Sequence, residues 1–218
     1  MPRDGGARRL QSGGRVESIR SIVERRGVKL LAHFTRAENL DGILAHGIRP
    51  RSKLPSSAIW NDDDRWDGHR DASCLSISWP NYKMFYRLRC EHPEVDWVVL
   101  ALDPSILWEC DCAFCPTNAA SGEMTSIPLA DRAGPAALER LFQDVGGKPT
   151  REEIRLPTRF PTDPQAEVLV FDTIGVGKIF GISVESRRVK SELEGRCSGL
   201  SVRFDHTPFD GRFDHQHW

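Results

Sequence analysis

The strongest constraint on the fold is an irregular, proline-containing loop that runs directly into an apolar strand. Three prolines interrupt residues 157–164, and residues 167–171 then read Glu-Val-Leu-Val-Phe. Clustered prolines disfavour a helix, and a run rich in β-branched and aromatic side chains predicts a buried strand. Because side chains alternate along a strand, Gln165 and Glu167 should face the same side at its start. The pair predicts a polar site at the edge of a core, and a solvated strand end is the simpler alternative.

Length and charge limit the classes of protein to which this chain can belong. The 218 residues carry a formal net charge of −1, so any nucleic-acid binding must come from a local patch rather than from bulk charge. We expect a disordered Gly- and Arg-rich lead-in over residues 1–15 and one domain over residues 16–218. No apolar run approaches the roughly 20 residues that span a bilayer, and no apolar signal core begins the chain. These features predict a cytoplasmic protein with no membrane partner.

Three of the six cysteines form a dense group. Cys110, Cys112 and Cys115 could bind zinc, with Cys90 or His92 as a fourth ligand. Zinc sites usually combine two separated ligand pairs, and no second pair is visible here. We therefore expect free thiols and no metal, and keep zinc as the minor alternative.

Apolar periodicity and turn residues predict an α+β fold with a largely antiparallel or mixed sheet. The strands are expected over residues 28–34, 72–79, 97–102, 167–171 and 178–184. The helices are expected over residues 16–26, 81–89, 134–145 and 186–193, with a helical turn over residues 104–108. A polar segment, residues 49–70, contains Trp60 and Trp66 and is expected to be a loop that covers a ligand, and residues 114–121 are expected to be another loop.

A histidine is expected at an anion-binding position. Thr35 and Glu38 have the Thr-x-x-Glu spacing of a capping box, which predicts a helix that starts there and ends at Gly47. His33 would then lie at the end of a strand, next to a helix N-terminus that favours anions. The alternative is a structural histidine hydrogen-bonded near the core.

Three spaced features resemble mono-ADP-ribosyltransferases. These are His33, Ser76-Ile77-Ser78 on a strand, and Gln165-Ala166-Glu167. Residues 33–44, 80–86, 117–120 and 164–168 further resemble the DarT family, bacterial DNA ADP-ribosyltransferase toxins paired with a macrodomain antitoxin. The resemblance covers roughly residues 31–171 and extends to the tail, in which residues 203–206 (Arg-Phe-Asp-His) recur as residues 212–215. It implies mixed or antiparallel sheets around a central NAD cleft with flanking helices.

The resemblance also implies an activity, the transfer of ADP-ribose from NAD to a nucleobase of single-stranded DNA with release of nicotinamide. Glu167 would stabilise the positive charge that builds on the ribose, and Lys83 would meet the pyrophosphate or neutralise the acceptor. Gln165 would hold the acceptor base. Independently of the resemblance, Arg155 and Arg159 lie on a cationic loop that could guide the DNA strand, and a solvated loop is the alternative. The NAD-binding residues implied are His33, Thr35, Asn39, Ser76, Ser78 and Tyr82.

One residue departs from the family pattern. Asn81 stands where family members often carry an arginine after the proline, and Lys83 cannot reproduce a bidentate arginine contact. The target base is therefore open, and the Gln-x-Glu pair slightly favours guanine, which has an exocyclic amine, over thymine. Two other functions stay open: ADP-ribosylation of RNA or protein, and a non-catalytic nucleic-acid module stabilised by zinc.

Overall fold

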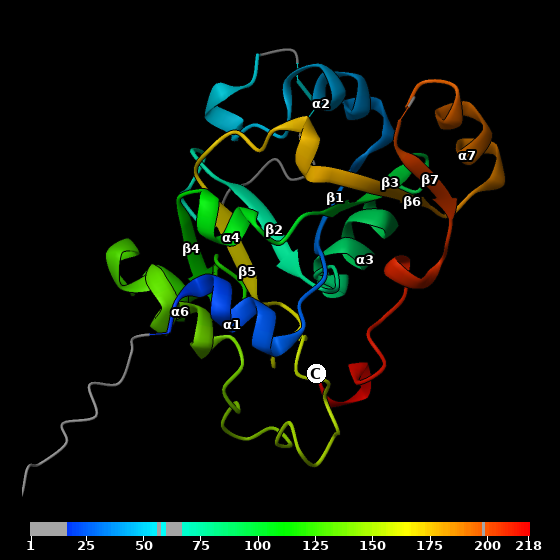
Figure 1. The fold of residues 1–218 in the computed structure, drawn as a ribbon. Helices are drawn as coiled ribbons and strands as arrows, with labels where there is room; N and C mark the ends of the chain where they lie inside the picture. The colour runs from blue at the N-terminus through cyan, green and yellow to red at the C-terminus, as the bar shows by residue number, and fades with distance from the viewer. Residues whose placement is uncertain (1–16, 56–57, 60–66, 198) are drawn as a thin grey trace, which may run out of the picture.

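A computed structural model describes residues 17–55, 58–59, 67–197 and 199–218. The expected lead-in and the segment with Trp60 and Trp66 lie outside these residues. The described strands form one sheet in the order β4-β5-β2-β1-β3-β6-β7 (Figure 1). They are β1 (Leu31–Arg36), β2 (Ser73–Ile77), β3 (Trp97–Leu102), β4 (Cys112–Cys115), β5 (Glu167–Val170), β6 (Ile179–Val184) and β7 (Ser201–Phe204). Neighbouring strands are antiparallel except β6 and β7, which are parallel. The mixed α+β class is confirmed.

Helices pack on this sheet from several sides (Figure 1). They are α1 (Ile19–Arg26), α2 (Leu40–His46), α3 (Tyr82–Glu91), α4 (Ile106–Glu109), α5 (Gly122–Thr125), α6 (Gly134–Arg140) and α7 (Arg187–Glu194). Helix α1 shows why these boundaries arise: the Ser18 hydroxyl caps its first turn, and Gly27, in the left-handed conformation (φ 68°), ends it. Among the described helices, none is long and apolar enough to cross a membrane.

The two faces of the sheet carry different apolar layers. Along β5, Val168 and Val170 pack into the main core, whereas Leu169 packs into a smaller cluster on the opposite face. Glu167 therefore starts on the same face as Leu169, as the alternation along a strand requires. Helix α3 covers β1 and β3 through Phe85, which contacts the buried side chains of both strands.

The sheet opens between β1 and β2. These strands pair only at Leu31↔Ile77 and Ala32↔Ser76. Beyond that point β1 pairs on its other side with β3, and β2 pairs with β5. Residues 33–36 and residues 73–75 thus face each other without a backbone ladder between them, which leaves room for a cavity lined by strand residues.

A close backbone contact between the end of helix α2 and Ile174 holds the helix beside this opening. Gly47 ends the helix with φ 78°, and a Cβ atom there would collide with the carbonyl oxygen of Ile174. Ile48 forms an antiparallel bridge to Ile174. Only glycine suits both the left-handed backbone and the close approach.

The predicted capping box is wrong. Thr35 lies inside β1, opposite Val98 of β3, so its backbone is extended and cannot begin a helix. A 3₁₀ turn (Ala37–Asn39) follows, and α2 starts at Leu40 with no side-chain cap from Asn39. His33 accordingly lies within a strand and not beside a helix N-terminus.

Other boundaries also differ. The strand predicted over residues 72–79 stops at Ile77 because Ser78 adopts a left-handed backbone (φ 64°). The helix predicted over residues 134–145 ends at Arg140. Strands β4 and β7 were not predicted: each has four residues, too few for an alternating pattern to stand out.

Candidate active site

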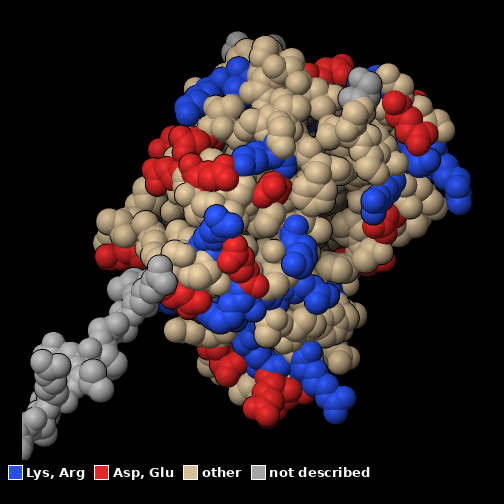
Figure 2. Space-filling view, viewed as in Figure 1, with Lys and Arg blue, Asp and Glu red and all other residues tan. Residues whose placement is uncertain are grey.

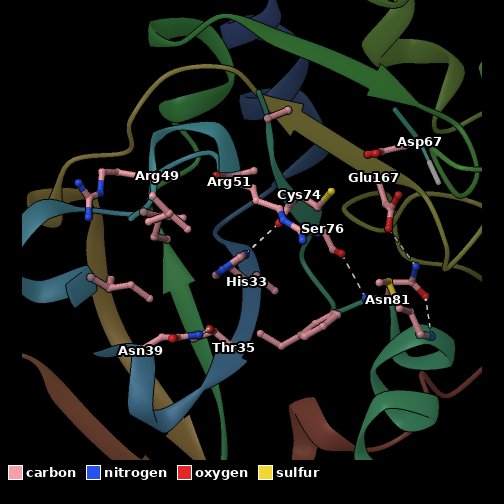
Figure 3. Close-up of a pocket in the computed structure, with 18 of the residues that line it drawn as sticks. His33, Thr35, Asn39, Arg49, Arg51, Asp67, Cys74, Ser76, Asn81 and Glu167 are labelled. Atoms are coloured by element: carbon pink, nitrogen blue, oxygen red, sulfur yellow. Dashed lines mark hydrogen bonds between the residues drawn. The ribbon is translucent and has the colours of Figure 1, made fainter. Parts of the chain in front are cut away.

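A cavity of about 800 Å³ occupies the opening between β1 and β2 (Figure 3). Strand β1 contributes residues 32–35, and β2 contributes Ser73, Cys74 and Ser76. The start of α3, helix α2 and the residues that precede β5 close the remaining sides. Of the sequence-predicted residues, the cavity is lined by His33, Thr35, Asn39, Ser76, Lys83, Gln165 and Glu167.

His33 bridges the two diverging strands. Its Nδ1 lies 2.9 Å from the carbonyl oxygen of Cys74, so Nδ1 carries a proton and donates it. Burial lowers the pKa of His33, and this hydrogen bond opposes the shift. A neutral imidazole therefore leaves Nε2 as a hydrogen-bond acceptor. The anion site expected here is not supported, because an uncharged ring at mid-strand offers no positive charge.

Thr35 and Asn39 form a polar pair on the same wall of the cavity. The Asn39 side-chain amide donates to the Thr35 hydroxyl at 3.0 Å and to the carbonyl oxygen of Ile59 at 3.2 Å. Thr35 is buried. The amide thus orients the hydroxyl and joins the turn before α2 to Ile59, which also lines the cavity.

Glu167 is a buried carboxylate, only 6% exposed, on the opposite wall. One of its oxygens accepts a hydrogen bond from the backbone N–H of Ala119 at 2.9 Å. The other accepts from the side-chain amide of Asn81 at 3.3 Å. Both donors hold the carboxylate in one orientation.

Asn81 links three parts of the site. Its side-chain oxygen accepts from the backbone N–H of Met84 and caps α3 at 3.2 Å, which turns the amide nitrogen toward Glu167. Its own backbone N–H donates to the Ser76 hydroxyl at 3.1 Å. Asn81, which is 1% exposed, therefore joins the start of α3, strand β2 and the carboxylate of β5 through its side chain and its backbone N–H.

Cationic side chains gather around the cavity. The lining contains Arg49, Arg51, Lys83 and Arg87, against the acids Glu38, Asp67 and Glu167. The Nε atom of Arg49 is buried and finds no hydrogen-bond partner among the described residues. A partly buried guanidinium with a spare Nε–H donor is suited to a phosphate group.

A family model described as ssDNA thymidine ADP-ribosyltransferase, DarT, matches residues 32–208 of this chain. The chain belongs to the DarT family. This match confirms the resemblance drawn from the short motifs.

Solved DarT structures have the same fold as this chain. DarT from Thermus sp. 2.9, solved with carba-NAD+, matches with a TM-score of 0.55 at 16% identity, over 84% of this chain and 98% of that one. The same protein with ADP-ribosylated ssDNA matches with a TM-score of 0.56 at 15% identity, over 84% and 97% of the two chains. DarTG from Thermosipho africanus in complex with ADP-ribose matches with a TM-score of 0.54 at 20% identity, over 83% of this chain. This chain spans only 51% of that DarTG chain. A search of curated proteins finds no match.

Several of the site residues predicted from the sequence do not line the cavity. The Ser78 hydroxyl donates to the carbonyl oxygen of Arg159 at 3.0 Å, away from Ser76, because the left-handed backbone turns it aside. The Tyr82 hydroxyl is buried without a hydrogen-bond partner among the described residues, and burial raises the pKa of Tyr82. Arg155 and Arg159 are exposed on the loop that precedes β5.

The cysteines of this group contact different partners and do not form a common site. The Cys112 thiol donates to the carbonyl oxygen of Ile106, whereas Cys115 contacts the guanidinium of Arg132. Burial raises the pKa of Cys112 to about 12 and that of Cys115 to about 11, which disfavours the thiolates that zinc requires. The described residues contain no cluster of His, Cys, Asp or Glu that could hold a metal ion.

Sequence reasoning did not identify all of the groups that surround this cavity. Arg49 and Arg51 follow a few residues after the DarT-like residues 33–44, and this nearness was the sequence signal that could have identified them. The backbone N–H of Ala119 lies in the family-like residues 117–120, but nothing in a sequence marks a backbone donor. Asn81 was noted as a departure from the family, yet its contact with Glu167 depends on the tertiary fold.

Proposed function

We propose that this protein transfers ADP-ribose from NAD to a thymine base of single-stranded DNA and releases nicotinamide. The observation that carries the proposal is Glu167, a buried carboxylate held by two hydrogen bonds in a cavity whose opposite wall holds His33. Membership of a family described as ssDNA thymidine ADP-ribosyltransferases supports the reaction and the target. The family description favours thymine over guanine, against the slight preference drawn from the Gln-x-Glu pair.

The cavity residues fit NAD as the co-substrate. A volume of about 800 Å³ lies within the usual range for ligand sites. The spare donor of Arg49, with Arg51 nearby in the lining, suits the diphosphate. His33 and Thr35, with Asn39 holding Thr35, provide hydrogen-bonding groups for the adenosine side, and Ser76 braces the network around Glu167.

The reaction breaks the bond between nicotinamide and its ribose, and the electron pair leaves with neutral nicotinamide. Positive charge builds on the ribose carbon, as in glycoside cleavage. Glu167 stabilises that charge and orients a ribose hydroxyl, and its two donors keep it in place before the reaction begins. A preorganised group of this kind contributes on the order of 3–4 kcal/mol.

The acceptor nitrogen must lose a proton as the new bond forms. Thymine within a strand has one ring N–H, so attack by that nitrogen releases its proton, and we assign the uptake to the Glu167 carboxylate. Gln165 lines the cavity and offers one donor and one acceptor to the base edge. In duplex DNA this edge is paired, which explains a requirement for single-stranded DNA.

The acceptor strand would run along the loop before β5. Arg155 and Arg159 are exposed there, whereas Arg151 is engaged internally with the carbonyl oxygens of Pro157 and Phe160. In Figure 2, Lys and Arg side chains gather, mixed with acidic ones, over α1 and the loop beneath it. A local cationic surface of this kind can guide a DNA backbone despite the net charge of −1.

The biological setting is a further part of the proposal. The similarity to a DarTG protein supports a toxin that acts in the cytoplasm and is opposed by an antitoxin. We propose a macrodomain as that antitoxin, because an ADP-ribosylated base is the product it would have to bind.

The decisive experiment is mass spectrometry of single-stranded oligonucleotides after incubation with the protein and NAD. One oligonucleotide contains thymine and no guanine, and another contains guanine and no thymine. We expect an ADP-ribose adduct on the first and none on the second. Labelled NAD traced into DNA, RNA and protein separates the alternative acceptors, and an adduct on RNA or protein alone would contradict the proposal.

Glu167→Gln should lower transfer roughly 10²- to 10³-fold, the usual loss for one preorganised group. It should leave NAD binding in place, which shows that the variant is folded. Glu123→Gln, a change at an exposed glutamate on α5, is the matched control and should react like the wild type. Full transfer by the Glu167 variant would refute the assigned role.

A further inference from the structure

Three aromatic side chains form a continuous ledge beside the loop that precedes β5. The ledge consists of Trp79, Phe160 and Phe213. The ring centroids of Trp79 and Phe160 are 6.2 Å apart at 76°, and those of Phe160 and Phe213 are 6.1 Å apart at 56°. Phe160 is buried, but Phe213 is 54% exposed. The outer end of the ledge therefore presents an aromatic face to solvent.

The backbone on both sides of Phe213 is fixed by a buried ion pair. Arg212 and Asp214 are each almost fully buried, and the guanidinium makes two short hydrogen bonds to the carboxylate, at 2.6 and 2.7 Å. The same guanidinium donates to the carbonyl oxygens of Pro161 and Thr162 at 2.8 Å. These contacts fix the backbone on both sides of Phe213, whose side chain is exposed.

The backbone links the ledge to the acceptor side of the cavity, although none of the three ledge side chains lines that cavity. Pro161 and Thr162, which Arg212 holds, lie a few residues before Gln165, and Trp79 lies two residues before Asn81. The Ser78 hydroxyl ties the backbone of Arg159 to the end of β2. The exposed Arg159 guanidinium stacks over the Phe160 ring, 4.5 Å from its centroid. A positive charge therefore sits beside the aromatic rings.

We propose that Phe213 stacks on a base of the acceptor DNA strand next to the base that is modified, with Arg159 meeting the adjoining phosphate. This inference rests on the proposed function. Aromatic platforms with neighbouring cations are the usual means of holding single-stranded nucleic acids. A ring fixed before binding loses little conformational entropy when a base stacks on it. Phe213 lies outside the residues that the family model matches, so the proposal rests on the contacts of this chain alone.

The test measures binding of a fluorescein-labelled, thymine-containing single-stranded oligonucleotide by fluorescence anisotropy, without NAD. Phe213→Ala and Phe213→Leu should both weaken binding by roughly five- to 150-fold, the range expected for loss of one base–aromatic stack. Phe213→Trp should bind at least as tightly as the wild type, because it keeps an aromatic face. Phe180→Ala is the matched control, since Phe180 on β6 is 50% exposed, and it should change nothing.

Three outcomes would overturn the inference. They are unchanged binding by Phe213→Ala, wild-type binding by Phe213→Leu, and an equal loss in Phe180→Ala. Nicotinamide release from NAD without DNA should be the same in all these variants as in the wild type. If the wild type modifies DNA while the Phe213 variants bind normally, only the stacking role fails. If the wild type transfers no ADP-ribose to DNA, the proposed function itself fails.

Discussion

Asn81 provides a direct test of how the carboxylate is held. Asn81→Ala removes both the amide donor to Glu167 and the cap of α3, whereas Asn81→Asp keeps a good cap but replaces the donor with a second carboxylate next to Glu167. We expect transfer to fall by about 10- to 100-fold in both variants, since a hydrogen bond to a charged group contributes roughly 1.5–3 kcal/mol. Steady-state transfer of ADP-ribose to an oligonucleotide measures the loss.

Thermal unfolding distinguishes the two Asn81 variants. Only Asn81→Ala should be destabilised through the cap, by about 1 kcal/mol. If Asn81→Asp retained full activity, the amide donor would have no part in orienting Glu167. Loss of NAD binding in both variants would instead place Asn81 in the binding of the co-substrate.

His33 makes stability depend on pH in a predictable direction. Burial lowers the pKa of His33 below its ordinary value of 6.5, so the unfolded chain binds a proton there more readily than the folded one. The contribution of His33 to the free energy of unfolding is fully present above about pH 6.5. It decreases as the pH falls below that value, by at most about 1.4 kcal/mol per pH unit. Denaturant unfolding of the wild type and of His33→Gln between about pH 7.5 and 5.5 measures the difference.

The exposed His46 on α2 provides the control for this titration. His46→Gln should keep the wild-type pH dependence, whereas His33→Gln should flatten it. Parallel curves for the wild type and His33→Gln would mean that His33 does not stay neutral when buried.

At the scale of elements, the reactivity of the cysteines in strand β4 tests whether they are free thiols or zinc ligands. Cys112 and Cys115 are buried and have raised pKa values, whereas Cys90 on α3 is exposed. Iodoacetamide at about pH 8 should therefore label Cys90 quickly and β4 only after unfolding. Mass spectrometry of the peptides reports the sites. If a chelator made Cys110, Cys112 and Cys115 reactive in the folded protein, zinc would be holding them.

The sequence predicted elements best where the pattern was long or strongly apolar. β3 was predicted residue for residue, and β5 and β6 within one residue, because their runs are continuously apolar and flanked by turn residues. The capping box failed because the backbone of Thr35 pairs with β3, and tertiary pairing outweighs a local helix signal worth about 1 kcal/mol.

The sequence predicted several residues of the candidate site but not the arrangement of their side chains. His33, Ser76 and Glu167 were expected to meet, and all three line one cavity. Ser78 and Tyr82 were expected with them because the family resemblance implied both as NAD-binding residues. A single left-handed residue after β2 turned the Ser78 side chain elsewhere, and no local pattern predicts such a backbone.

At the scale of the whole molecule, the cavity exists because the sheet divides. Strands β1 and β2 share only two residue pairs and then follow different neighbours, β3 and β5. This divergence depends on the packing of all four strands and leaves no trace in any one segment. The His33 hydrogen bond to Cys74 spans the two halves at this point, so the site is also part of what joins them.

The buried ion pair of the tail should control the stability of the loop before β5. Arg212→Met would leave Asp214 buried with the Trp218 indole as its other hydrogen-bond donor and would free the carbonyl oxygens of Pro161 and Thr162. Loss of one partner of a buried pair costs about 3–5 kcal/mol, so the midpoint of denaturant unfolding should fall accordingly. The double variant Arg212→Met/Asp214→Asn removes the uncompensated charge and should lose less than the single variant. A single variant as stable as the wild type would mean that the tail is not anchored by this pair, and the fixed position of Phe213 would then lack its physical cause.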